Sequence, residues 1–288
     1  MATELRQQVR MVSSIDEMRE ISKSFHGSTL GFVPTMGSLH DGHMSLVKQS
    51  LKICDHTVVS IFVNPRQFGP NEDLDVYPHD LEGDIEKLEL AGVDVLFHPN
   101  RETIYPRGFK THVQVDEITQ HLCGNSRPEL FKGVATVVLK LFNIVHPQHV
   151  FFGEKDWQQL KVIRTMVNDL NMEILIESKP IVREKDGLAM SSRNQYLSAA
   201  DRISARSLSQ ALKSAQASIS KGEQSAENIR TEIRKKIELN NGIMVDYISI
   251  CDPDNFKEQS KIGSKTLIAL AVRIGSVRLI DNRFIERV

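Results

Sequence analysis

The sequence has few cysteines and no long hydrophobic run. Its three cysteines, Cys54, Cys123 and Cys251, are scattered over 288 residues and show no ligand-type spacing. This argues against a disulfide framework and a zinc site, and it favours reduced thiols in the cytoplasm. The longest unbroken apolar run, Leu267–Val272, is far too short to cross a bilayer. We therefore expect no association with membranes.

An excess of charge of one sign is also missing. The 36 Lys and Arg residues nearly balance the 37 Asp and Glu residues, which gives a formal net charge of −1. A near-neutral chain argues against nucleic acid as a partner. The first residues, Met1–Arg6, contain no apolar signal-peptide core, so we expect a cytoplasmic protein. Hydrophobic and charged fractions of 40% and 25% are ordinary for a globular fold.

Strand-like and helix-like stretches alternate between residues 29 and 178. The sequence predicts strands at Thr29–Pro34, Thr57–Val63, Asp94–Pro99, His149–Gly153 and Glu173–Glu177. The amphipathic stretches between them predict helices at Gly42–Ile53, Leu81–Ala91, Val134–Val145 and Asp156–Leu170. Because strands that alternate with helices form βαβ units with right-handed crossovers, we predict an α/β domain with a mostly parallel sheet.

The pattern changes after Pro180. A capping-box sequence from Ser198 to Asp201 predicts the start of a long helix, and Gly222 separates this helix from a second one ending near residues 240–242. Strands are expected at Met244–Ile250, Lys265–Arg273 and Val277–Ile280. Helices followed by antiparallel strands predict a smaller α+β domain. We therefore divide the chain into domains of residues 1–180 and 181–288.

A string with two histidines follows the first predicted strand. It reads Pro34-Thr35-Met36-Gly37-Ser38-Leu39-His40-Asp41-Gly42-His43 and leads into a predicted helix. Ligands of α/β sheets bind at the carboxyl ends of strands, and a helix N-terminus offers N–H groups to phosphate. The glycines allow the backbone to approach a phosphate closely. Two alternatives stay open: the histidines ligate a metal, or they are ordinary turn residues.

Two further strings follow predicted strands. The segment from Asn64 to Pro70 contains Gln67, an uncharged donor and acceptor suited to a hydroxylated organic acid. The turn Gly153-Glu154-Lys155-Asp156 opens a predicted helix with Lys155 beside it. Turn chemistry alone also explains the first string, and a helix N-cap at Asp156 with a solvated Lys155 also explains the second.

A fourth string, Met190-Ser191-Ser192-Arg193, ends a charged segment that begins near Val182. The two hydroxyls and the guanidinium group offer hydrogen-bond donors to a triphosphate. The charged, glycine-containing residues before Met190 predict a mobile loop, for which a simple linker is the alternative. The combination of His-x-Gly-His with a later Met-Ser-Ser-Arg is the pattern of enzymes that transfer AMP to a carboxylate or phosphate.

These four strings, together with Phe131 to Val138, resemble the pantoate–β-alanine ligase (pantothenate synthetase) family, which belongs to a nucleotidyltransferase group related to class I aminoacyl-tRNA synthetases. The similarity runs from about residue 28 to residue 198. It implies a Rossmann-like N-terminal domain, a smaller C-terminal lid domain and a homodimer. It also implies ATP-dependent condensation of pantoate with β-alanine to pantothenate through a pantoyl adenylate, with release of AMP and pyrophosphate.

The resemblance implies an ATP site formed by the histidine string and two of the other strings. His43 would be the proton donor and His40 its partner on the phosphates, while Lys155 and Arg193 would complete the catalytic set. The implied ATP-binding residues are Pro34, Thr35, Met36, Gly37, Ser38, Leu39, His40, Asp41, Gly42, His43, Gly153, Glu154, Lys155, Asp156, Val182, Met190, Ser191, Ser192 and Arg193.

The resemblance also implies a substrate site and a magnesium ion. Gln67 and Gln159 would hold pantoate, Asn64 would lie with them, and Gln67 would also lie near β-alanine. Magnesium would be held chiefly by the ATP phosphates, and Asp84 is the carboxylate that we expect near it.

The chain departs from the family pattern at two positions. His79 and Leu130 stand where the family often has Arg and His, and no substrate role is therefore carried over to residue 130. Two other functions stay open. One is a nucleotidyltransferase whose product keeps the nucleotide on a phosphorylated substrate. The other is a tRNA synthetase fragment that acts on RNA, against which the near-neutral charge argues.

Overall fold

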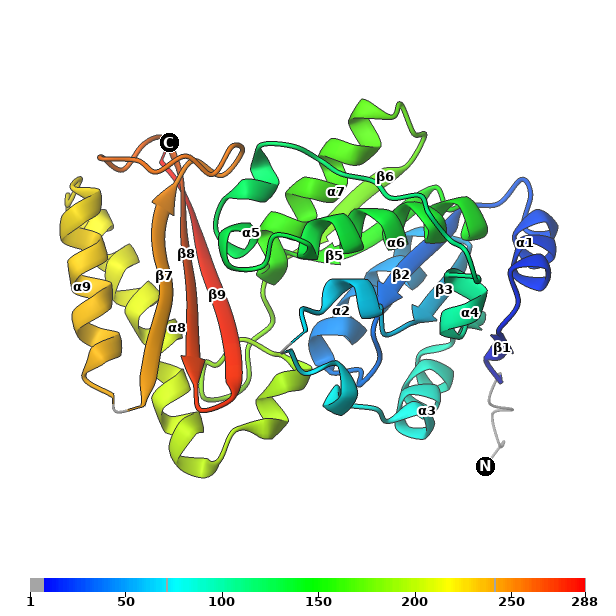
Figure 1. The fold of residues 1–288 in the computed structure, drawn as a ribbon, viewed down its shortest axis with the longest axis horizontal. Coiled ribbons are helices and arrows are strands. Elements are labelled where there is room, and N and C mark those ends of the chain that lie inside the picture. The colour runs from blue at the N-terminus through cyan, green and yellow to red at the C-terminus, as the bar shows by residue number, and fades with distance from the viewer. Residues whose placement is uncertain (1–7, 71, 241, 288) are drawn as a thin grey trace. The chain divides into compact units, whose positions relative to one another are not determined.

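The computed structural model describes residues 8–70, 72–240 and 242–287. These residues fall into two compact units, each built on its own sheet (Figure 1). The first unit takes in the chain up to Val115 together with Glu129–Glu154 and Gln159–Pro180. The second takes in Asp116–Pro128, Lys155–Gln158 and the chain from Ile181 onward. Two short segments that precede residue 181 therefore belong to the second unit.

The first unit has a six-stranded parallel sheet, which confirms the predicted α/β class. The spatial order of the strands is β1-β4-β3-β2-β5-β6. Their bounds are β1 Arg10–Val12, β2 Leu30–Thr35, β3 His56–Ile61, β4 Val95–Phe97, β5 His149–Gly153 and β6 Leu175–Lys179. The strands from β2 to β6 coincide with the predicted ones to within a few residues.

The helices of the first unit alternate with these strands. Their bounds are α1 Ile15–Ser24, α2 Asp41–Ile53, α3 Leu81–Ala91, α4 Arg101–Ile104 and α6 Leu130–Val145, with short 3₁₀ turns η1 Pro65–Gln67 and η2 Leu74–Val76. The turn η4 Glu154–Asp156 and the helix α7 Trp157–Asp169 are divided between the units, because Lys155–Gln158 belong to the second. The ends of α3 follow directly from the sequence. Asp80 caps the first turn by accepting the N–H of Gly83, and Gly92 ends the helix in the left-handed conformation that glycine tolerates.

The strand order creates a switch point between β2 and β5. From β2 the chain first builds outward through β3 and β4, and it later returns to add β5 and β6 on the other side of β2. The chain therefore leaves β2 and β5 in opposite directions across the sheet, which is the topological switch point of an open α/β fold. Ligands of open α/β sheets bind at such a point, so we expect the functional site at the carboxyl ends of β2 and β5.

The second unit is an α+β structure. Its antiparallel sheet has the order β7-β8-β9, formed by Ile243–Cys251, Lys265–Ile274 and Val277–Glu286. Two long helices, α8 Ala199–Ser220 and α9 Ala226–Glu238, begin at the serine N-caps Ser198 and Ser225. The short elements η3 Ile118–Gln120, α5 Cys123–Ser126 and η5 Ser192–Tyr196 complete it. The cap at Ser198 and the antiparallel pairing were both predicted.

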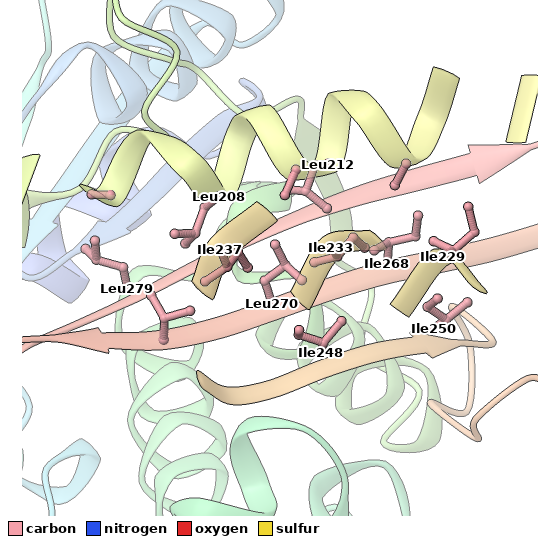
Figure 2. Close-up of a cluster of buried hydrophobic side chains, with 14 of the residues drawn as sticks. Leu208, Leu212, Ile229, Ile233, Ile237, Ile248, Ile250, Ile268, Leu270 and Leu279 are labelled. Carbon is pink, nitrogen blue, oxygen red and sulfur yellow. The ribbon is translucent and has the colours of Figure 1, made fainter. Parts of the chain in front are cut away.

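The core of the second unit lies between its sheet and its helices. Figure 2 shows Ile229, Ile233 and Ile237 of α9 among Ile248 of β7 and Leu270 of β8. The three isoleucines of α9 recur every four residues and therefore share one helix face. Each of them is fully buried. Within the described residues, no helix is long and apolar enough to cross a membrane.

Candidate functional site at the sheet switch point

The histidine string forms a tight turn between β2 and α2. Thr35 ends β2, and its hydroxyl donates to the carbonyl of Ser60 at 2.8 Å and accepts the N–H of Gly37 at 3.2 Å. The chain then passes through two consecutive left-handed residues, Gly37 with φ +83° and Ser38 with φ +51°. A left-handed serine is unfavourable, so neighbouring contacts must hold the turn in this conformation.

The buried carboxylate of Asp84 on α3 supplies those contacts. One oxygen accepts the N–H of Ser38 at 2.7 Å, and the other accepts the N–H of Leu39 at 2.6 Å. The residue is only 1% exposed, and this burial raises the pKa of its carboxyl group, while the backbone bonds and Lys87 act in the opposite direction. Asp84 therefore clamps the turn that leads to the histidines.

Both histidines cap α2 through their side chains. His40 is the N-cap residue, and its Nδ1 atom accepts the N–H of Gly42 at 3.1 Å. The Nδ1 atom of His43 accepts the N–H of His40 at 3.4 Å, and the two rings stack with centroids 4.0 Å apart. A backbone N–H can only donate, so in each neutral ring the hydrogen is on Nε2. The turn thus fixes one tautomer for both histidines.

The string after β3 contains a second set of side-chain bonds. Asn64 is the N-cap of η1 and is 1% exposed. Its amide nitrogen donates to Oε1 of Gln67 at 2.9 Å and to the carbonyl of Gly133 on α6 at 3.1 Å. Gly133 lets η1 pack closely against α6, because a Cβ atom at that position would lie 2.0 Å from the carbonyl oxygen of Arg66.

The string after β5 is divided between the two units. Gly153 ends β5, and Glu154 accepts a hydrogen bond from the hydroxyl of Ser178 at 3.0 Å. Gly153, Glu154 and the half-buried Gln159 belong to the first unit. Lys155 and Asp156 belong to the second unit. There the carbonyl of Lys155 accepts a hydrogen bond from the side chain of Asn282 at 2.9 Å.

The fourth string lies in the second unit and has a defined turn before it. Val182 and Met190 face each other across the turn, where the N–H of Met190 donates to the carbonyl of Val182 at 3.0 Å. Arg183 forms two bonds with the buried Asp281, at 2.7 and 2.9 Å. Ser191 then caps η5, which contains Ser192 and Arg193. The charged residues that predicted a mobile loop thus include an anchor to β9.

The structure therefore places three of the predicted strings at the carboxyl ends of neighbouring strands in the first unit. These strings follow β2, β3 and β5 and contain His40, Asn64 and Gly153. Within the part of the chain that the structure describes, no group of three or more His, Cys, Asp or Glu side chains is arranged to hold a metal ion. The expectation of magnesium near Asp84 stays a prediction, and both oxygens of this carboxylate accept main-chain N–H groups.

Comparison with known proteins gives matches over nearly the whole chain. The model of the family described as Pantoate-beta-alanine ligase matches residues 10–284. A pantothenate synthetase of Acetivibrio thermocellus is 50% identical over 280 residues, which cover 96% of this chain and 100% of that protein. A pantothenate synthetase of Caldicellulosiruptor bescii is 52% identical over 278 residues, which cover 96% and 99% of the two chains.

Solved structures agree with these matches. The pantothenate synthetase of Thermus thermophilus superposes with a TM-score of 0.92 at 43% identity and covers 96% of this chain and 99% of its own. A pantoate-beta-alanine ligase of Francisella tularensis, described as complexed with beta-gamma ATP and beta-alanine, has a TM-score of 0.79 at 36% identity and covers 96% and 97%.

Proposed function

The chain belongs to the pantoate-beta-alanine ligase family, and we propose that it joins pantoate to β-alanine in an ATP-dependent reaction that forms pantothenate. The observation that carries this proposal is the position of the strings after β2, β3 and β5, which surround the switch point of the parallel sheet. The Francisella relative, described as complexed with beta-gamma ATP and beta-alanine, supports the same substrates.

We propose that the reaction has two steps. A carboxylate oxygen of pantoate attacks the α-phosphorus of ATP, the bond to the β-phosphate breaks, and pyrophosphate leaves. The amine of β-alanine then attacks the acyl carbon of the pantoyl adenylate, the bond to AMP breaks, and the amine loses a proton as the amide forms. Adenylation is needed because a free carboxylate has a poor leaving group, and covalent activation divides one difficult step into two easier ones.

The histidines act on the phosphates in this proposal. Both Nε2 atoms carry a hydrogen in the neutral rings, since both Nδ1 atoms accept backbone N–H groups. Together with the positive end of the α2 dipole, these donors stabilise negative charge that develops on the phosphates during the transfer. His43 is the principal donor and His40 its partner, and Asp84 keeps the preceding turn in place.

Other residues bind the two substrates. Gln67 and Gln159 hold pantoate, with Asn64 supporting Gln67, and Gln67 also lies near β-alanine. The remaining ATP contacts come from Gly153 to Asp156, Val182, and Met190 to Arg193. Lys155 and Arg193 are the cations that neutralise the triphosphate. We propose that residues 1–180 bind ATP and pantoate and that residues 181–288 act as a lid, which would protect the adenylate from water.

Magnesium enters this proposal as part of the Mg–ATP substrate, held by the phosphates. Among the described residues, no group of three or more His, Cys, Asp or Glu side chains is arranged to hold a metal ion, and the oxygens of Asp84 accept the N–H groups of Ser38 and Leu39. A homodimer, which the resemblance to the family implies, and a cytoplasmic location, which the sequence predicts, complete the proposal.

ATP–pyrophosphate exchange tests the first step directly. Exchange should require pantoate but not β-alanine, and ATP with pantoate alone should release a burst of about one pyrophosphate per active site. Adding β-alanine should then give steady production of AMP and pantothenate. If pyrophosphate appears only with β-alanine present, the two-step mechanism is wrong.

The products also separate the competing functions. A nucleotidyltransferase acting on a phosphorylated substrate would leave the nucleotide in its product, so free AMP would not accumulate. ADP and phosphate would show that the carboxylate is phosphorylated instead. Retention of tRNA in a filter-binding assay at moderate salt would support the RNA-binding alternative.

A further inference from the structure

The hairpin of residues 182–190, which leads into the Met-Ser-Ser-Arg string, is anchored to two other elements of the second unit. Arg183 forms two bonds with Asp281 of β9, at 2.7 and 2.9 Å. Glu184 on the same hairpin binds the guanidinium group of Arg202 on α8 through one of its oxygens. The hairpin is therefore held in place before the string begins.

The side chain of Asn194 returns to this hairpin after the string Met190–Arg193. Asn194 lies in η5 and is only 7% exposed. Its Nδ2 group donates to Oε1 of Glu184 at 2.7 Å and to the carbonyl of Ala189 at 3.0 Å. Ala189 directly precedes the string and Asn194 directly follows it, so the second bond closes a ring that contains all four residues of the string.

The two acceptors fix the orientation of the Asn194 amide. A main-chain carbonyl can only accept, so the NH₂ group must face Ala189. The opposite orientation would set oxygen against oxygen at both bonds. The amide oxygen is buried and has no hydrogen-bond partner among the described residues, although a buried unpaired oxygen costs free energy. The amide thus keeps two donor bonds to the hairpin, although its oxygen gains no partner.

We propose that Asn194 is a positioning residue that holds the Met190–Arg193 string in the shape that receives the triphosphate of ATP. The string leaves the hairpin at Ala189 and is tied back to it by Asn194, so both of its ends are attached to one anchored element. Donors stabilise developing charge on a phosphate best when they are already in place, and a displacement of about 1 Å lowers rates by about 100-fold. This inference rests on the proposed role of the string in binding ATP.

Two substitutions at Asn194 test the inference. Asn194→Ala removes both bonds, and Asn194→Asp keeps the size of the side chain but sets an oxygen against each acceptor. Each should lower kcat/KM for ATP in pantoate-dependent pyrophosphate exchange at about pH 8 by about 10- to 100-fold, while the KM for pantoate stays within about twofold of the wild type. A normal kcat/KM for ATP in either variant, or an equal loss for ATP and pantoate, would overturn the inference.

Thr266→Val is the matched control for a purely structural effect on the second unit. Thr266 is fully buried, and its hydroxyl accepts the N–H of Gly263 at 3.0 Å and donates to Oε1 of Gln259 at 2.8 Å, so it closes another loop of this unit. The control should lose stability in urea and keep both kinetic values. A loss of kcat/KM for ATP equal to that of Asn194→Ala would overturn the inference.

Glu184→Ala decides the matter if the variants of Asn194 do not fold. The side chain of Glu184 is 25% exposed, so its removal is tolerated better, and it takes away one of the two acceptors of Asn194. This variant should lower kcat/KM for ATP by about 3- to 10-fold and leave the KM for pantoate within about twofold. An unchanged kcat/KM for ATP would overturn the inference.

A double-mutant cycle with Arg193→Ala separates the possible failures. If Asn194 acts through the string, the loss of kcat/KM for ATP caused by Asn194→Ala should be at least about threefold smaller in the Arg193→Ala background. Equal losses in both backgrounds would overturn the inference. If Arg193→Ala itself leaves ATP kinetics unchanged, the proposed role of the string fails and the inference fails with it. An effect of Arg193→Ala without one of Asn194→Ala refutes the inference alone.

Discussion

The substitution Asp84→Asn should disable the histidine turn while preserving side-chain size. The carboxylate of Asp84 accepts two main-chain N–H groups, at 2.7 Å from Ser38 and 2.6 Å from Leu39. An amide has only one oxygen, so its NH₂ group must face one of the two N–H groups as donor against donor. The left-handed conformation of Ser38 then loses part of its support.

The size of the effect follows from these contacts. A hydrogen bond to a buried charged group contributes about 1.5–3 kcal/mol, and a neutral amide avoids some of the cost of burying a carboxylate, so we expect a net loss of about 1–3 kcal/mol of unfolding free energy. The effect on the reaction should be larger in relative terms. A displacement of about 1 Å of catalytic groups lowers rates by about 100-fold, so we expect kcat to fall by about 10- to 100-fold.

Urea unfolding and steady-state kinetics of two variants test the role of Asp84. Asp94→Asn is the matched control, since Asp94 accepts the N–H of Thr57 at 2.8 Å near the amino end of β3, away from the switch point. Both variants should lose stability, but only Asp84→Asn should lose kcat. An unchanged kcat in Asp84→Asn, or an equal fall in both variants, would refute the assignment of Asp84 to the turn.

Two further predictions concern the histidines and the thiols. His43→Ala should slow pantoate-dependent pyrophosphate exchange by roughly 10²–10⁴-fold and change ATP affinity far less, whereas His149→Ala, at the amino end of β5, should not; near-normal exchange in His43→Ala would contradict its role. Burial raises the pKa of the Cys251 thiol from 9.0 to about 12, so iodoacetamide should spare Cys251 in the folded protein at pH 8.5, as mass spectrometry would show. The stabilising effect of this shift is complete below pH 9 and is lost as the pH rises toward 12.

The sequence predicted the parts of the fold in which local pattern and tertiary structure agree. Strands β2 to β6 and helices α2 and α3 carry clear periodicity, and the cap of α8 is readable from Ser198 and Asp201. Strand β1 was not predicted, because its three residues, Arg10–Val12, are too short to show any period. Helix α1 was also missed, although Ser14 followed three residues later by Glu17 is a capping signal.

The contacts that shape the site were less accessible to sequence reasoning. Asp84 lies 45 and 46 residues from the N–H groups that it accepts, and no local pattern indicates such a distance. The side chain of Gln158 likewise joins the carbonyls of Ile118 and His121, about 40 residues away, and this bond helps explain why two short segments belong to the second unit. Patterns within one strand or helix give the element, but only the folded chain shows which distant group completes a turn.

The cap at the start of α2 requires both imidazoles to be neutral. An imidazolium ring carries hydrogen on both nitrogens, so a protonated His40 can no longer accept the N–H of Gly42, and a protonated His43 can no longer accept that of His40. Two cationic rings stacked at 4.0 Å would also repel each other. A charged imidazole and an intact cap on the first turn of α2 therefore exclude each other.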